Sequence, residues 1–126
     1  IFGKPCNQDE AVSRWARMSL SSGYLHTGHS LFRRTSLVGV TGDIALDSFI
    51  TEIVTTTVHF AALTRKEINA YVATGEPMQC AGGFALEGMG GMFVNGIEGC
   101  YSNVIGLSLP WLRKSLFDAG VEDLGL

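Results

Sequence analysis

The distribution of glycine is the feature that most constrains the fold of this chain. Seven glycines fall between Gly82 and Gly99, and short apolar runs such as Met92-Phe93-Val94 separate them. A flexible linker would be polar and would lack these apolar residues. Glycine placed between apolar residues indicates a backbone that takes positive φ or closely approaches another group. The segment from Gly75 to Pro110 is therefore predicted to be ordered, with either a ligand or another strand as its close neighbour.

Capping residues and apolar spacing predict helices in three places. The clearest is a capping box, in which the Thr64 hydroxyl accepts from the third helical N–H and Glu67 reaches back to the cap. Leu63 and Ile68 provide the matching hydrophobic staple. The predicted helices begin near Asn7, Thr64 and Ser108 and end near Leu20, Gly75 and Gly120. Their apolar stripes are Val12, Trp15, Ala16 and Met18 in the first, Ile68, Tyr71 and Val72 in the second, and Leu109, Leu112 and Leu116 in the third.

Runs of β-branched residues predict the strands, because these side chains favour extended backbone. The clearest strand is Ile50 to Phe60, with Val54, Thr56, Val58 and Phe60 on one side. Tyr24 to Phe32 and Ser36 to Val40 are also predicted as strands. Because strands and helices alternate, we expect a single α/β domain over residues 1–126, with a mixed sheet and flanking helices.

Composition excludes several classes of protein. The 126 residues suffice for one modest domain with a core. The net charge of −3 provides no basic patch, which argues against a protein that binds duplex nucleic acid. Apolar runs are only a few residues long, so no membrane span is predicted. Cys6, Cys80 and Cys100 form an odd set without CxxC spacing, which predicts reduced thiols.

Several motifs, in colinear order, resemble the Maf-type nucleoside triphosphate pyrophosphatases. They are Phe2-Gly3-Lys4-Pro5, His26-Thr27-Gly28, Thr56 to Phe60, Gly75-Glu76-Pro77, and the AG, EG, GG, FV, IEG, SNV and GL pieces that follow. The resemblance covers nearly the whole chain. It implies a Maf-like fold, a nucleoside triphosphate as substrate, and hydrolysis of that substrate to the monophosphate and pyrophosphate. It also implies a homodimer and a cytoplasmic location, with no nucleic-acid or membrane partner.

The start of the chain departs from the family pattern. In that family an SPRR loop and an Ala-Asp-Thr strand end, whose Asp is the catalytic base, precede the Gly-Lys-Pro motif. Here Ile1 lies just before Phe2. We therefore expect the later part of a Maf-like domain, with the catalytic Asp upstream of Ile1. Two alternatives remain: a catalytically inactive nucleotide-binding or protein-interaction module, and an interaction protein that affects formation of the division septum.

Lys4 is the first candidate for the site. The family uses this lysine to hold phosphate, and an ammonium there could neutralise a triphosphate oxygen. Pro5 stiffens the backbone beside it. Apart from the resemblance, a solvated lysine is the alternative interpretation of a Lys-Pro pair.

Glu87 is the candidate for reading the base. Much of the family has Gln at this position. A carboxylate only accepts hydrogen bonds, so it suits a base that presents two donors, such as guanine. Cys80 before Ala81-Gly82 resembles the branch that acts on 7-methyl-GTP, whereas many dTTP and UTP enzymes have Asp-Lys at the positions of Gln79 and Cys80. We expect the substrate to be a non-standard or modified guanine nucleotide. The alternative substrates are dTTP and UTP, as for a dTTP/UTP pyrophosphatase. The alternative role for Glu87 is that of a surface glutamate without a part in binding.

The remaining site residues are expected to contact substrate, each with a structural role as its alternative. They are Gln79, Cys80, Gly82, Thr27, Ser102 and Asn103. The resemblance implies that water attacks the α-phosphorus with the help of a divalent cation, Mg²⁺ or alternatively Mn²⁺. The three histidines do not have the spacing of a metal site, so no metal ligand is assigned.

Overall fold

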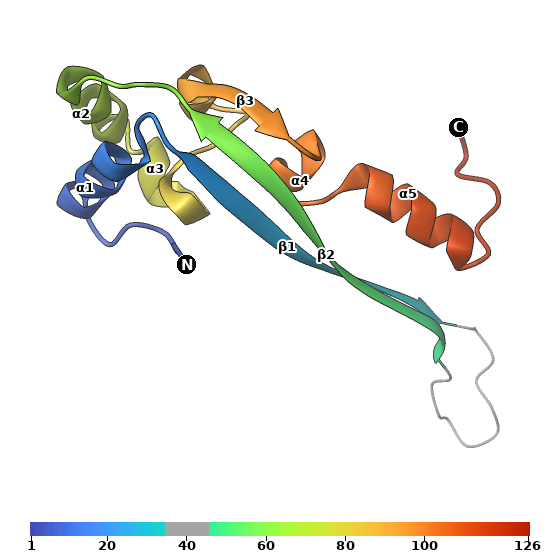
Figure 1. Ribbon diagram of the computed structural model, residues 1–126. Helices are drawn as coiled ribbons and strands as arrows, with labels where there is room; N and C mark the ends of the chain where they lie inside the picture. The colour runs from blue at the N-terminus through green and yellow to red at the C-terminus, as the bar shows by residue number, and fades with distance from the viewer. Residues whose placement is uncertain (35–45) are drawn as a thin grey trace.

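The computed structural model describes residues 1–34 and 46–126 of the chain (Figure 1). Its elements are, in order, α1 (Gln8–Met18), β1 (Ser22–Arg34), β2 (Leu46–Phe60), α2 (Arg65–Ala73), α3 (Glu76–Gln79), the 3-10 helices η1 (Ala81–Gly83) and η2 (Met89–Phe93), β3 (Val94–Glu98), α4 (Tyr101–Ile105) and α5 (Leu109–Asp118). The expected α/β architecture with flanking helices is confirmed. The strand predicted at Ser36 to Val40 lies outside the described residues.

The sheet is built around a long antiparallel ribbon. Strands β1 and β2 pair from Ser22↔His59 outward, and β3 adds to the far edge of β2 near Thr57, so the strand order is β1-β2-β3. Figure 1 shows the ribbon projecting away from the cluster formed by α1, α2 and α3. Both long strands extend past their predicted bounds, because ladder pairing satisfies backbone groups whatever side chains they carry. All pairings in the described part of the sheet are antiparallel.

Trp15 on α1 is the centre of the core. It is fully buried, and its ring packs edge-to-face against Phe60, Tyr71 and Phe93 at centroid distances of 5.6, 5.3 and 5.8 Å. Its Nε1–H donates to the Gly83 carbonyl at 2.9 Å, which ties α1 to η1. The buried core residues are Ala11, Trp15, Val58, Phe60, Ile68, Tyr71 and Val72. The buried face predicted for the helix after Thr64 is therefore confirmed. On β2, the residues Thr56, Val58 and Phe60, which were predicted to share one side, are all buried.

Two predicted apolar stripes are wrong in part. On α1, Ala16 is exposed whereas Arg14 is only 3% exposed. On α5, Leu109 is 57% exposed, while Trp111 and Ser115 are buried. The buried face of α5 is rotated because the Trp111 ring packs on His29 of β1, 4.7 Å between centroids. The buried face of α5 thus depends on a partner far away in the sequence, whereas Gly3 and Glu10, the partners of Arg14, lie at the start of the chain.

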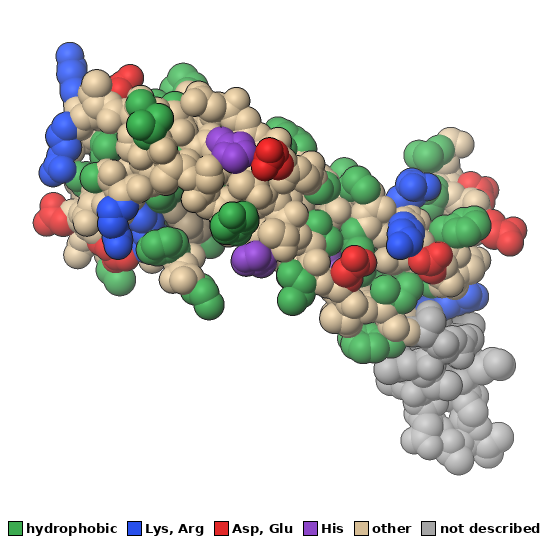
Figure 2. Space-filling view, in the orientation of Figure 1, with side chains coloured by type: hydrophobic (Ala, Val, Ile, Leu, Met, Phe, Trp, Pro, Cys, Tyr) green, Lys and Arg blue, Asp and Glu red, His purple; other side chains and the backbone are tan. Residues whose placement is uncertain are grey.

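Hydrophobic side chains also occur on the surface. Figure 2 shows them spread along one face of the molecule and not gathered into a single patch. On the ribbon, exposed Phe32 and Phe49 cover each other, with ring centroids 4.7 Å apart. Across residues 1–34 and 46–126, every helix falls short of the length and apolar character that a bilayer crossing requires.

Candidate functional site

A cleft of about 350 Å³ lies between β1, the segment after α3, and α4. Four of the residues predicted to contact substrate line it: Thr27, Cys80, Glu87 and Asn103. They come from three separate parts of the sequence, so the fold brings together side chains that were predicted one at a time. The predicted residues Lys4, Gln79, Gly82 and Ser102 are not part of this lining.

Glu76 shapes the glycine-rich side of the cleft. Its carboxylate accepts hydrogen bonds from the Tyr71 hydroxyl at 2.6 Å and from the backbone N–H groups of Met89 and Gly90 at 2.9 and 2.8 Å. Burial alone would raise the pKa of Glu76, but the hydrogen bonds from Tyr71, Gly90 and Met89 outweigh it and lower that pKa. An ionised carboxylate therefore fastens the glycine segment to α2. Glu76 was not among the predicted site residues, although a carboxylate between Gly75 and Pro77 in an apolar setting was a usable signal.

The glycines allow the chain to approach itself. A Cβ at Gly90 would lie 2.5 Å from the Tyr71 hydroxyl and 2.9 Å from the Ala85 carbonyl oxygen. At Gly99, where φ is +123°, a Cβ would lie 3.2 Å from the Thr55 carbonyl oxygen on β2. The glycine segment was expected to lie close to a ligand or to another strand. At Gly99 the close neighbour is strand β2, whereas at Gly90 it is the Tyr71 side chain and the backbone of Ala85 in the same segment.

Glu87 and Cys80 differ in their electrostatic surroundings. The Glu87 side chain is exposed at the cleft, and it makes no hydrogen bond or ion pair with any residue that the structure describes. Burial raises the pKa of the Cys80 thiol, the carboxylates of Glu76 and Glu87 raise it further, and Lys4 opposes them. Cys80 is therefore a protonated thiol at neutral pH. Lys4 lies close enough for its charge to act at the cleft.

Asn103 lines the same cleft and carries a buried acceptor. It is fully buried, and its Nδ2 donates to the Val54 carbonyl and the Thr56 hydroxyl, both at 3.1 Å. Its Oδ1 receives no hydrogen bond from any described residue. An unpaired buried acceptor is costly, so a ligand that donates to it would gain the full hydrogen bond.

The other predicted residues have structural contacts or lie on the surface. The Ser102 hydroxyl accepts from the Leu109 N–H at 2.9 Å, which joins α4 to α5. The Gly82 N–H donates to the Gly3 carbonyl at 3.2 Å, which joins η1 to the segment that carries Lys4. Gln79 is exposed at the end of α3.

His26 lines the cleft beside Thr27, although the sequence analysis gave it no role. Its Nδ1 lies 2.8 Å from the Thr55 hydroxyl on the neighbouring strand. The His-Thr-Gly motif was the signal that could have identified it.

The described residues do not fit a cation site built by protein ligands. No group of three or more His, Cys, Asp or Glu side chains is placed to hold a metal within residues 1–34 and 46–126. Glu87 is the single carboxylate among the described residues of the lining. Mg²⁺ commonly binds through one or two carboxylates together with substrate phosphates and waters, so one carboxylate does not define such a site.

Comparison with known proteins gives a consistent result. The family model for "Maf-like protein" matches residues 1–119. A protein named "Nucleoside triphosphate pyrophosphatase" from Parasynechococcus marenigrum (strain WH8102) is 53% identical over 122 residues, which cover 97% of this chain and 58% of that protein. A protein of the same name from Prochlorococcus marinus (strain MIT 9313) is 57% identical over 116 residues, covering 92% of this chain and 57% of that protein. The chain thus spans 57–58% of the length of these two relatives.

Proposed function

The chain belongs to the Maf-like protein family, and on that basis we propose that it provides the base-reading and phosphate-binding side of a nucleoside triphosphate pyrophosphatase. The reaction would convert a nucleoside triphosphate into the monophosphate and pyrophosphate. Relatives that carry this activity in their names are about half identical to the chain, which supports the proposal.

The cleft is the observation that carries this function. It gathers Thr27, Cys80, Glu87 and Asn103, and its volume of about 350 Å³ falls in the range of small-molecule sites. The lining combines apolar side chains such as Phe84 with a few polar groups that could orient a base. This combination is typical of a nucleotide pocket and not of a flat protein interface.

We propose a guanine-type base, with 7-methyl-GTP as the leading candidate. Glu87 offers a carboxylate without a described protein partner, and this group can accept from the ring N–H and the amino group of guanine. Asn103 also lines the cleft, and its buried Oδ1 has no described hydrogen-bond partner, so we propose it as a second acceptor. Both the Glu87 carboxylate and the Asn103 Oδ1 favour a base whose contacting edge carries several hydrogen-bond donors. The dTTP and UTP alternative presents fewer donors to Glu87.

Lys4 would hold the phosphates. Water would attack the α-phosphorus and release a proton as the new P–O bond forms. The bond from the α-phosphorus to the oxygen that bridges it to the β-phosphorus would break, and pyrophosphate would leave. An ammonium close to the leaving phosphates would stabilise the charge that develops there. Mg²⁺, or Mn²⁺ as the alternative, remains a proposed cofactor, and no step is assigned to it because the described residues do not form its site.

Nucleotide protection of Cys80 tests occupancy of the cleft directly. Alkylation of Cys80 at mildly alkaline pH would be followed by mass spectrometry with 7-methyl-GTP, GTP, dTTP or UTP present. We expect guanine nucleotides to slow labelling of Cys80 but not of Cys6, which is exposed outside the cleft. Protection equal for all four nucleotides would contradict the guanine assignment, and protection by none would contradict the proposed site.

Release of pyrophosphate from the same nucleotides, with Mg²⁺ present, tests catalysis. The matched variant is Glu87→Gln, which preserves the shape of the side chain and removes its charge. We expect this variant to lose preference for guanine nucleotides. Pyrophosphate release would also be measured for a version extended upstream of Ile1 to include the expected catalytic Asp. Protection of Cys80 without release by that extended version would instead favour the alternative of a nucleotide-binding module, which the placement of Glu87 and Asn103 at one cleft also supports.

A further inference from the structure

We propose that Arg14 and Glu10 are positioning residues for Lys4, because they fasten the backbone on both sides of it. The inference rests on the proposed function, in which Lys4 meets the phosphates. It assigns a role to a buried arginine that lies outside the cleft.

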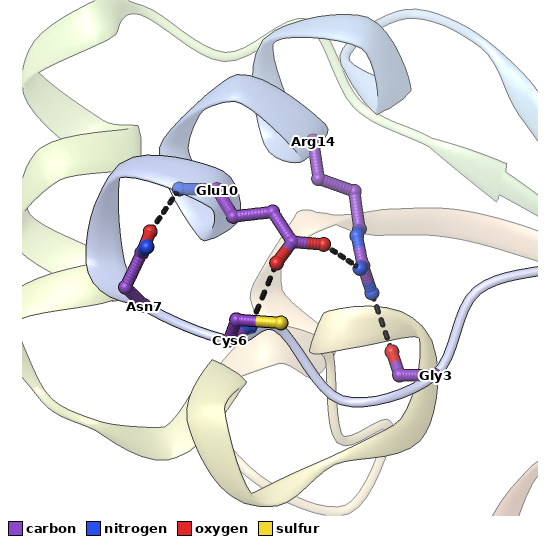
Figure 3. A network of polar contacts seen from close by, with 5 residues as sticks. All are labelled: Gly3, Cys6, Asn7, Glu10 and Arg14. Atoms are coloured by element: carbon purple, nitrogen blue, oxygen red, sulfur yellow. Dashed lines mark hydrogen bonds and ion pairs between the residues drawn. The ribbon is translucent and has the colours of Figure 1, made fainter.

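The contacts form a continuous network (Figure 3). The Arg14 guanidinium donates to the carbonyl of Gly3 at 2.5 Å and pairs with one carboxylate oxygen of Glu10 at 2.6 Å. The other carboxylate oxygen of Glu10 accepts from the backbone N–H of Cys6 at 2.7 Å. Gly3, which precedes Lys4, and Cys6, which follows Pro5, are therefore both hydrogen-bonded to the Arg14–Glu10 ion pair.

Burial restricts Arg14, whereas the Glu10 side chain is 38% exposed. Arg14 is 3% exposed, and a buried guanidinium is costly unless it is paired and hydrogen-bonded. Its Nη1 and Nη2 have such partners, while Nε has none among the described residues. Asn7 caps the first turn of α1 by accepting from the Glu10 N–H at 2.8 Å, so the helix fixes the backbone from which Glu10 projects. Helix α1 thus holds the backbone of both Arg14 and Glu10 in place. If either side chain released the segment around Lys4, it would also lose a hydrogen-bond partner of its own.

A further contact connects the segment to the cleft. The Gly3 carbonyl also accepts from the Gly82 N–H at 3.2 Å. Pro5 is buried, and its Cγ would lie 3.7 Å from a Cβ at Gly83. The backbone around Lys4 therefore has a fixed place beside η1, while the Lys4 side chain remains exposed. Fixing this backbone in advance lowers the entropy cost of bringing the ammonium to a phosphate.

The alternative is that Arg14 only closes the N-terminal segment over α1. Its guanidinium lies 4.9 Å from the centre of the Phe2 ring, and that of Arg17 lies 5.8 Å from it. Arg17 makes this contact without holding the backbone around Lys4 in the described hydrogen bonds, so Arg17→Gln is a matched control on the same helix.

A double-mutant cycle tests the positioning role. Affinities for GTP and for guanosine would be measured for the unchanged chain, Lys4→Ala, Arg14→Gln and the double variant. We expect Arg14→Gln to weaken GTP binding by about tenfold, a coupling within the range found inside one hydrogen-bond network. Guanosine affinity should be unchanged, and Arg14→Gln should have no further effect once Lys4 is Ala. Arg17→Gln should leave both affinities unchanged.

Glu10→Gln protects the test against a folding defect in Arg14→Gln. The single amide oxygen can accept from the Cys6 N–H or from Arg14 but not from both, so one of the two contacts is kept and we expect a smaller loss of GTP affinity in the same direction. Additive effects of Lys4→Ala and Arg14→Gln, or an equal loss of guanosine affinity, would overturn the positioning role and leave the proposed function standing. If Lys4→Ala left GTP affinity unchanged, the phosphate role of Lys4 would fail first, and the positioning role with it.

Discussion

The Glu76 carboxylate lies 2.6 Å from the hydroxyl of Tyr71, and this hydrogen bond joins the glycine-rich side of the cleft to the hydrophobic core. Tyr71 is 3% exposed and packs on Trp15, so its hydroxyl is a fixed donor. Glu76 uses its remaining acceptor capacity for the N–H groups of Met89 and Gly90. The shape of the cleft therefore depends on one carboxylate outside its lining.

Glu76→Gln is expected to lower the free energy of unfolding by about 1.5–3 kcal/mol, the value typical of hydrogen bonds to a charged group. The amide keeps one acceptor oxygen and presents donors to the N–H groups of the glycine segment. Urea denaturation would measure the change. Glu122→Gln is the control, because Glu122 is exposed. An equal effect of both substitutions would show that the network around Glu76 does not stabilise the fold.

The same carboxylate predicts how stability depends on pH. The pKa of Glu76 is lower in the folded chain than in the unfolded chain. Its contribution is therefore present above the unfolded pKa of about 4.3 and is lost as pH falls through the folded pKa. Urea midpoints measured from neutral pH into this acid range should fall less steeply in Glu76→Gln than in the unchanged chain. Parallel curves for the two proteins would contradict the prediction.

Gly90→Ala is expected to be strongly destabilising. The new methyl group would meet the Tyr71 hydroxyl at 2.5 Å and the Ala85 carbonyl oxygen at 2.9 Å, so the segment would have to shift. Overpacking of this kind typically costs about 1–3 kcal/mol. Gly96→Ala is the matched control, because a Cβ there has no described atom within 4 Å. Thermal melts that show similar losses for both substitutions would contradict the close approach at Gly90.

Asn103→Ala is expected to affect both stability and ligand binding. The change removes the donors to Val54 and Thr56, which should cost about 1–3 kcal/mol of unfolding free energy. It also removes the buried Oδ1, so GTP affinity measured by calorimetry should fall beyond the loss seen in Thr56→Val. That control removes the hydroxyl that contacts Asn103 and the Cys100 backbone but keeps Oδ1 in place. Equal GTP affinity for the two variants would show that Oδ1 does not meet the ligand.

Local signals in the sequence predicted the helix ends and one face of the sheet correctly. Asn7 caps α1, Thr64 and Glu67 form the capping box, and Ser108 accepts from the Trp111 N–H at 3.3 Å. These interactions join residues three positions apart, so spacing alone reveals them. The motifs that carried the family resemblance were also continuous in sequence, and the family match over residues 1–119 is consistent with them.

The candidate site was predictable only as a set of separate residues. The sequence named Thr27, Cys80, Glu87 and Asn103, but it also named Gln79 and Ser102, which lie outside the lining. Nothing in the spacing indicated that Arg14 would be buried or that Glu76 would hold the glycine segment.

By itself, the sequence determined where three helices begin and which β2 residues share one side, because these depend on neighbours along the chain. Only the tertiary structure decided the cleft, the burial of Arg14 against the Gly3 carbonyl and the partners of Glu76. Each depends on groups that become neighbours only when separate segments pack together, such as Arg14 with Gly3 and Glu76 with Gly90. Burial then makes those contacts strong, because removing either partner leaves a charge or a polar group without water.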